Sequence, residues 1–273
     1  MSILSSIYKE IKILRKNGLD KILLKSVPIF PVVKAHPYVI SKSEIENVCL
    51  RLIDVFGEEN VIVFGSSALC YYFDRSVGDL DFLIRSSSRL SIKPYIDSLK
   101  KAGFVYDKRD FNPFIKTETY HFYIYKNETK KEKIEVDLFE ITKVVYDMDF
   151  KKIVSSAVRF PIASTHKSML VTNPDILLYI KLKSWQNRLL NFRGDLDIDD
   201  AKKLITSVYP ALVDKYRTNF KKPTENCYQK INLPSGVMLP ISLNEIFGTH
   251  QPIRNLISLI GYLESLIRPY FLK

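Results

Sequence analysis

The chain has 273 residues, of which 46% are hydrophobic and 26% charged, and its formal net charge is +11 at pH 7. Those proportions are ordinary for a folded soluble protein. The positive charge favours a polyanionic partner or an anionic substrate, although a solvated basic surface would explain it too. Three widely separated cysteines without a CxxC pair give no support to a zinc knuckle or a disulfide framework, and they indicate a reduced, cytoplasmic protein. No apolar run approaches the ~20 residues of a membrane helix, so stable membrane insertion is not expected.

Residues 1–40 are expected to form a basic helical arm and a linker. Apolar residues recur at helical spacing through residues 1–25, and prolines 28, 31 and 37 mark an extended linker. Up to residue 40 there are seven Lys or Arg against two acids. The arm could bind RNA or a membrane surface, or pack its apolar stripe on the main domain.

Residues 41–160 alternate between helical and strand patterns and are expected to form an α/β core. Ser41 and Glu44 have the spacing of a helix-capping box, and Gly57 follows the helical pattern as its stop. Further helices are expected at 67–73 and 92–101. Strands are expected at 61–64 and 80–84, with a hairpin formed by 120–125 and 133–140.

Residues 161–273 are expected to form a mainly helical domain. Asn173-Pro174 is typical of a helix start, and a long helix is expected from there to about residue 192. A second helix is expected from Asp199, and a last amphipathic one at 253–266. The predicted fold class is therefore mixed α/β, with a helical C-terminal domain.

The chemistry concentrates in the run VIVFGSSALCYYFDRSVGDLDFLI, residues 61–84. A buried strand ends at Gly65-Ser66, where a turn that opens a helix presents backbone N–H groups to an anion such as a triphosphate. Asp79 and Asp81 follow, two apart on a strand, so both point to one face. If the later strand KIEVDLFE neighbours them, Asp137 joins the pair.

Three carboxylates can hold two Mg²⁺ ions, because Mg²⁺ prefers oxygen ligands and also engages substrate phosphates. Two such ions can activate an attacking hydroxyl and stabilise a leaving pyrophosphate, with Mn²⁺ able to substitute. Asp137 could also accept the proton of the attacking hydroxyl. A lone DxD is common on surface loops, but here it lies in an apolar strand, where unpaired charges are costly.

The Gly-Ser turn, the DxD strand and the later single Asp resemble the DNA polymerase β-like nucleotidyltransferase superfamily. The runs Ser67-Ala68-Leu69, Arg75-Ser76 and DLDF look most like the AbiEii/MenT-type toxin nucleotidyltransferases. Those enzymes continue with a helix of the form KLxAxxxR and then a DxxD, matched here by Lys181 and Arg188 followed by Asp197 and Asp200. The resemblance implies that Gly65, Ser66, Arg75, Lys181 and Arg188 bind the nucleotide and that the three acids bind metal.

The resemblance further implies transfer of a nucleoside monophosphate from an NTP to an acceptor hydroxyl. Together with the basic charge it favours an RNA acceptor, with the 3′ end of tRNA as a candidate, and it implies a toxin with a cognate antitoxin as partner. Two alternatives stay open. One is a small-molecule acceptor such as an aminoglycoside, and the other is a catalytically silent module that binds nucleotide or RNA.

Overall fold

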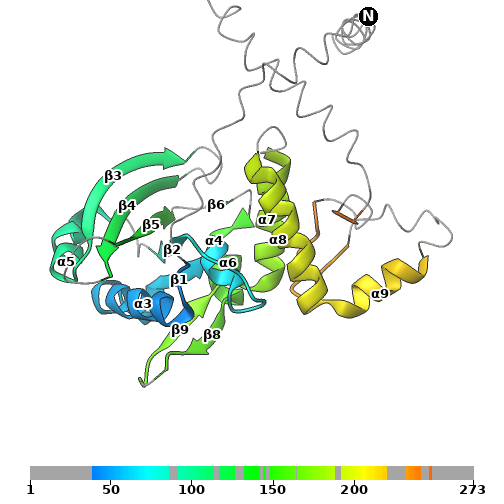
Figure 1. Ribbon diagram of the computed structural model, residues 1–273, viewed down its shortest axis with the longest axis horizontal. Helices are drawn as coiled ribbons and strands as arrows, with labels where there is room; N and C mark the ends of the chain where they lie inside the picture. Colours follow the sequence, from blue (N-terminus) through cyan, green and yellow to red (C-terminus); the bar gives the residue numbers. More distant parts are fainter. Residues whose placement is uncertain are drawn as a thin grey trace, which may run out of the picture. The chain divides into compact units, whose positions relative to one another are not determined.

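A seven-stranded mixed sheet is the framework of the computed structural model (Figure 1). The structure describes residues 39–85, 92–112, 117–126, 132–141, 144–145, 148–163, 165–187, 192–219, 231–240 and 246–247. Within these residues the sheet has the strand order β3-β4-β5-β2-β1-β9-β8, with helices packed around it. The predicted mixed α/β fold class is confirmed.

The strands of the large sheet come from residues on both sides of position 160. They are β1 (Val61–Phe64), β2 (Asp79–Arg85), β3 (Val105–Asn112), β4 (Thr117–Tyr125), β5 (Lys133–Ile141), β8 (Val158–Pro161) and β9 (Ser168–Val171). A separate two-stranded sheet joins β6 (Val144–Val145) to β7 (Met148–Asp149). The large sheet therefore draws strands from both segments that the sequence separates near residue 160.

The helices lie between and after these strands. They are α3 (Lys42–Phe56), α4 (Gly65–Leu69), α5 (Ile96–Lys101), α6 (Phe150–Ser156), α7 (Pro174–Asn187), α8 (Phe192–Val208) and α9 (Pro210–Asn219), with short 3₁₀ turns η1 (Glu58–Asn60) and η2 (Lys93–Tyr95). Helices α7 and α8 pack against each other, and α4 contacts both β2 and α7.

Strand direction decides where the acidic residues meet. β2 pairs with β5 in parallel and with β1 in antiparallel, while β1 pairs with β9 in parallel. β4 and β5 form the expected antiparallel hairpin. β2 is thus an inner strand with β5 on one side and β1 on the other, which brings residues from three chain segments to one region of the sheet.

Local sequence signals account for the first elements. Ser41 accepts a hydrogen bond from the Glu44 amide at 3.3 Å, and the Glu44 carboxylate accepts from the Ser41 amide at 2.7 Å, so the predicted capping box begins α3. Gly57, with φ 89°, ends this helix as predicted. Similarly, Asn173 accepts from the Asp175 amide at 2.8 Å and Pro174 occupies the first helical position of α7.

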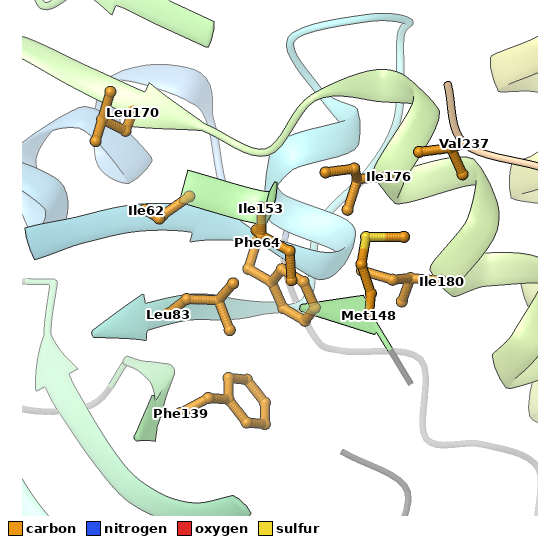
Figure 2. Packing of buried hydrophobic residues seen from close by; sticks show 10 residues of the cluster. All are labelled: Ile62, Phe64, Leu83, Phe139, Met148, Ile153, Leu170, Ile176, Ile180 and Val237. Carbon is orange, nitrogen blue, oxygen red and sulfur yellow. The ribbon is translucent and has the colours of Figure 1, made fainter. Parts of the chain in front are cut away.

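A hydrophobic cluster fills one face of the sheet (Figure 2). It joins side chains of β1, β2, β5, β7 and β9 to others from α6, α7 and the segment 231–240. Its members are Ile62, Phe64, Leu83, Phe139, Met148, Ile153, Leu170, Ile176, Ile180 and Val237. Leu83 and Phe139 are each two residues beyond Asp81 and Asp137, so alternation puts the acids on this same face. The acidic site therefore adjoins the buried core.

Several expected elements differ in the structure. The helix expected at 67–73 is α4, which already begins at Gly65, and the helix expected from Asp199 begins at Phe192. The long helix expected from Asn173-Pro174 is α7, and residues 188–191, over which it was expected to continue, lie outside the described residues. β3 and the hairpin of β8 and β9 were not predicted, because β3 is largely polar and β9 is only four residues long.

Other expectations lie outside the described residues, namely the helices at 1–25 and 253–266. The chain divides into two compact units, Met1–Val39 and Ile40–Lys273, and every element named above belongs to the second. In the part of the chain that the structure describes, no helix has the length and apolar character needed to span a membrane.

Candidate active site

Two neighbouring parallel strands, β2 and β5, carry the three predicted acids. Asp81 pairs directly with Asp137 across them. Asp79 precedes Asp81 by two residues, so strand alternation places all three on one face. Asp79 is paired with Glu135, an exposed acid on the same face for which the sequence suggests no role. The strand of Asp137 therefore lies next to the strand of Asp79 and Asp81, so Asp137 joins the pair as the sequence argument required.

The turn after β1 lies directly against Asp81. Gly65 has φ +56°, and a Cβ built on it would lie 2.2 Å from Asp81 Oδ2. A left-handed φ and this contact together exclude a larger residue. The Ser66 amide N–H, expected to face a phosphate, donates to the same carboxylate oxygen at 3.4 Å. The predicted phosphate turn and the predicted metal acids are thus one site.

Ser67 fixes this turn to β2. Its hydroxyl donates to the Asp79 carbonyl at 3.3 Å and accepts from the Asp81 amide at 3.1 Å, and its side chain is fully buried. From the sequence alone, Ser67 stands out only as part of a motif. The available signal was that Ser67 is a small polar residue shortly after a buried strand. A polar side chain that becomes buried needs a hydrogen-bond partner.

The acids repel one another. Burial raises the pKa of Asp81 well above its ordinary value, and the charges of Asp79 and Asp137 raise it further. Lys181 and the Ser66 amide act in the opposite direction but do not compensate. Because a shift of this kind means that the ionised form is disfavoured, the site has an excess of negative charge that a bound cation would relieve.

His121 on β4 holds Asp137. Its Nδ1 lies 2.7 Å from Asp137 Oδ1, and the two side chains are 25% and 23% exposed. Burial raises the pKa of Asp137 above its ordinary value, although the hydrogen bond and charge of His121 act to lower it. No sequence pattern identified a partner for His121, since the two residues are 16 positions apart and meet only through the strand pairing.

Helices α7 and α8 share a buried network of charges, which Arg75 joins. Lys181 Nζ on α7 is 3.0 Å from both Asp197 Oδ1 and Asp200 Oδ2 on α8. Arg75 Nε and one terminal nitrogen bind the two oxygens of Asp200 at 2.6 and 2.9 Å. Burial opposes the charge of Lys181, but the two carboxylates outweigh it and raise its pKa.

The structure brings most of the predicted site residues together. Gly65, Ser66, Asp79, Asp81 and Asp137 form the junction of β1, α4, β2 and β5, and Lys181 is close enough to act electrostatically on Asp81. Arg188 lies outside the described residues. Among the residues described, no three His, Cys, Asp or Glu side chains converge to hold one metal ion.

Comparison with known proteins gives a distant likeness. No protein-family model and no curated protein sequence matches the chain. An antigenic nucleotidyltransferase-like protein from Paracoccidioides brasiliensis superposes with a TM-score of 0.44 and 14% identity, covering 77% of this chain and 99% of that one. JHP933 from Helicobacter pylori gives 0.35 and 14%, covering 86% and 100%. At such scores the likeness assigns no activity.

Proposed function

We propose that the protein is a Mg²⁺-dependent nucleotidyltransferase that moves a nucleoside monophosphate from an NTP to an acceptor hydroxyl. One observation carries the proposal: Asp81 and Asp137 are direct partners on parallel strands, with Asp79 on the same face and the Gly65 turn against them. A half-buried acidic cluster of this kind is destabilising unless it binds cations, which makes a structural role a poor explanation.

The donor set suits Mg²⁺. In nucleotide enzymes this ion usually takes one or two carboxylates and completes its shell with substrate phosphates and water, so a preformed cage of three side chains is not required. Asp79, Asp81 and Asp137 would hold the metal, with two ions expected and Mn²⁺ as a substitute. When bound, the metal would lower the pKa of the attacking hydroxyl and neutralise charge on the leaving pyrophosphate.

The chain's own residues would do the rest. Gly65 leaves room for close approach at the turn, and the Ser66 hydroxyl, together with the Ser66 amide that donates to Asp81 in this structure, would donate to a bound triphosphate. Asp137 would accept the proton of the attacking hydroxyl. Lys181 offsets part of the negative charge at Asp81, although Asp197 and Asp200 also pair with its ammonium.

For the acceptor we favour RNA, with the 3′ end of tRNA as the first candidate and a toxin role with a cognate antitoxin as the biological setting. The net charge of +11 and the basic first 40 residues support an acceptor with a phosphate backbone. The resemblance of the sequence motifs to toxin nucleotidyltransferases points the same way.

The test is to incubate the purified protein with each labelled NTP, Mg²⁺ and total RNA, and to follow label transfer. Asp79→Asn, Asp81→Asn and Asp137→Asn should each abolish transfer. Asp97→Asn is the matched control, because Asp97 is 86% exposed on α5, away from the acidic site. Near-normal turnover in all three acid variants would overturn the proposal. Label on added small molecules but never on RNA would redirect it to another acceptor.

Stability gives a second readout from the same variants. Because burial, and after it the charges of Asp79 and Asp137, raise the pKa of Asp81, its ionised form destabilises the metal-free fold at neutral pH. Asp81→Asn removes that charge and should therefore raise Tm without Mg²⁺, while also removing the increase in Tm that Mg²⁺ and NTP produce in the wild type. Differential scanning fluorimetry measures both. A lower Tm without metal would contradict the repulsive cluster.

A further inference from the structure

His121 lies beside the acidic site but has no part in the proposed transfer as described so far. Antiparallel pairing of β4 with β5 sets His121 directly opposite Asp137. The 2.7 Å contact joins imidazole Nδ1 to one carboxylate oxygen, Oδ1. An ionised carboxylate can only accept, so the ring nitrogen donates. The contact therefore determines which of the two Asp137 oxygens is hydrogen-bonded to His121.

The other ring nitrogen also faces a carboxylate. His121 Nε2 lies 3.4 Å from Asp110 Oδ2 on β3, and the same Asp110 oxygen binds Lys108 Nζ at 2.7 Å. The chain of contacts crosses β5, β4 and β3 from Asp137 to an exposed lysine. Because the hydrogen bond at Nδ1 holds the imidazole against Asp137, the ring has restricted rotational freedom, which is the property expected of a group that orients a neighbouring ligand.

We propose that His121 is a positioning residue for Asp137. By binding Oδ1 it holds the carboxylate in one orientation and fixes which oxygen the side chain offers to metal and to the acceptor proton. This role rests on the proposed nucleotidyl transfer. Removal of a hydrogen-bonded partner behind a ligating carboxylate typically weakens metal affinity or activity by about 10–100-fold.

The plainer explanation is that His121 and Asp137 form a structural pair that stabilises the β-hairpin. The two explanations differ in what the variants do to metal affinity. A purely structural pair would lower Tm when broken, but it would leave Mn²⁺ binding by the folded protein unchanged. A positioning contact must change Mn²⁺ affinity in protein that is still folded.

The experiment compares His121→Ala and His121→Asn in the full chain. Asparagine retains an N–H donor near the place of Nδ1, whereas alanine retains none. His166→Ala is the matched control, because His166 is an exposed histidine in the connection between β8 and β9. The readouts are Mn²⁺ affinity from electron paramagnetic resonance titration, kcat and KM for transfer, and Tm.

We expect His121→Ala to weaken Mn²⁺ binding and lower kcat by about 10–100-fold, with a smaller change in KM for the NTP. His121→Asn should recover a large part of both, and His166→Ala should match the wild type. Unchanged Mn²⁺ affinity in folded His121→Ala would overturn the inference, as would an asparagine variant no better than alanine.

Failure of the proposed function is distinguishable from failure of this inference. If the wild type binds Mn²⁺ but transfers no nucleotide to any acceptor, the proposed function is wrong and the Mn²⁺ comparison still decides the role of His121. If the wild type binds no Mn²⁺ with or without NTP, the metal site is wrong and the inference falls with it.

Discussion

At the scale of single residues, Gly65 makes the closest approach to the acidic site. Its α-carbon lies against Asp81, and its φ of +56° is one that residues with side chains rarely adopt. We predict that Gly65→Ala lowers the free energy of unfolding by the left-handed backbone cost, about 1–2 kcal/mol, plus the cost of moving Asp81. Transfer should fall to background, since the displaced carboxylate is a proposed metal ligand.

Gly236→Ala separates those two effects. Gly236 has φ +73°, but a Cβ there would have no neighbour within 4 Å. The variant should therefore show only the backbone cost and keep full transfer. Chemical denaturation gives the stabilities, and the labelled-NTP assay gives the activity. Equal destabilisation and equal activity in the two variants would show that the contact with Asp81 is unimportant.

For single residues, the sequence predicts neighbours along one strand but not contacts between distant parts of the chain. That Asp79 and Asp81 point to the same face follows from their spacing of two on one strand, and this needs no tertiary information. The partners of Ser67, His121 and Arg75 lie 12 to 125 positions away and depend on strand order and helix packing. Sequence spacing carries no signal for such contacts, so their roles emerge only from the fold.

At the scale of elements, α7 and α8 are joined by buried charges as well as by apolar packing. The side chains of Lys181, Asp197 and Asp200 are only 10%, 5% and 7% exposed. Removing one partner from a buried ion pair typically costs about 3–5 kcal/mol, because the remaining charge is left without compensation. We predict a decrease of that size in the unfolding free energy for Lys181→Met.

Lys183→Met is the matched control on the same helix. Lys183 is half-buried, and its ammonium lies 5.8 Å from the centre of the Tyr179 ring, a contact worth about 0.5–1 kcal/mol. Urea unfolding should therefore distinguish the variants by several kcal/mol. If Lys181→Met also weakens NTP binding in folded protein, Lys181 acts on the nucleotide too, as the motif predicts. A Lys181→Met protein as stable as Lys183→Met would contradict the buried network.

Element prediction succeeded where local signals were strong and failed where tertiary context decided. The capping box of α3 and the Asn-Pro start of α7 are local and were confirmed. β3 carries charged and polar residues because it lies at the edge of the sheet, so it lacks strand alternation. The start of α8 was missed because Gly194 and two acids interrupt its apolar pattern.

At the scale of the whole molecule, the proposed roles divide between the two units of the chain. The site residues lie in Ile40–Lys273, whereas Met1–Val39 carries much of the excess positive charge. If this charge binds an RNA backbone, affinity must fall with salt, by about 0.7 log units per phosphate contact for each log unit of salt on single strands. We therefore predict steep salt dependence for RNA and a weaker one for NTP.

Charge reversal tests where RNA binds. Lys12→Glu with Lys16→Glu should weaken RNA binding and make the salt slope shallower by about 0.7 for each phosphate that the arm no longer neutralises. Lys100→Glu with Lys101→Glu changes the net charge by the same amount on the exposed surface of α5 and should have less effect. NTP affinity should stay constant in both, because neither lysine pair is among the residues proposed to bind the nucleotide or the metal. Equal weakening by the two pairs would mean that total charge, not the arm, attracts RNA.

A flat salt response in the wild type would remove the case for an RNA acceptor and leave a small-molecule acceptor as the better hypothesis.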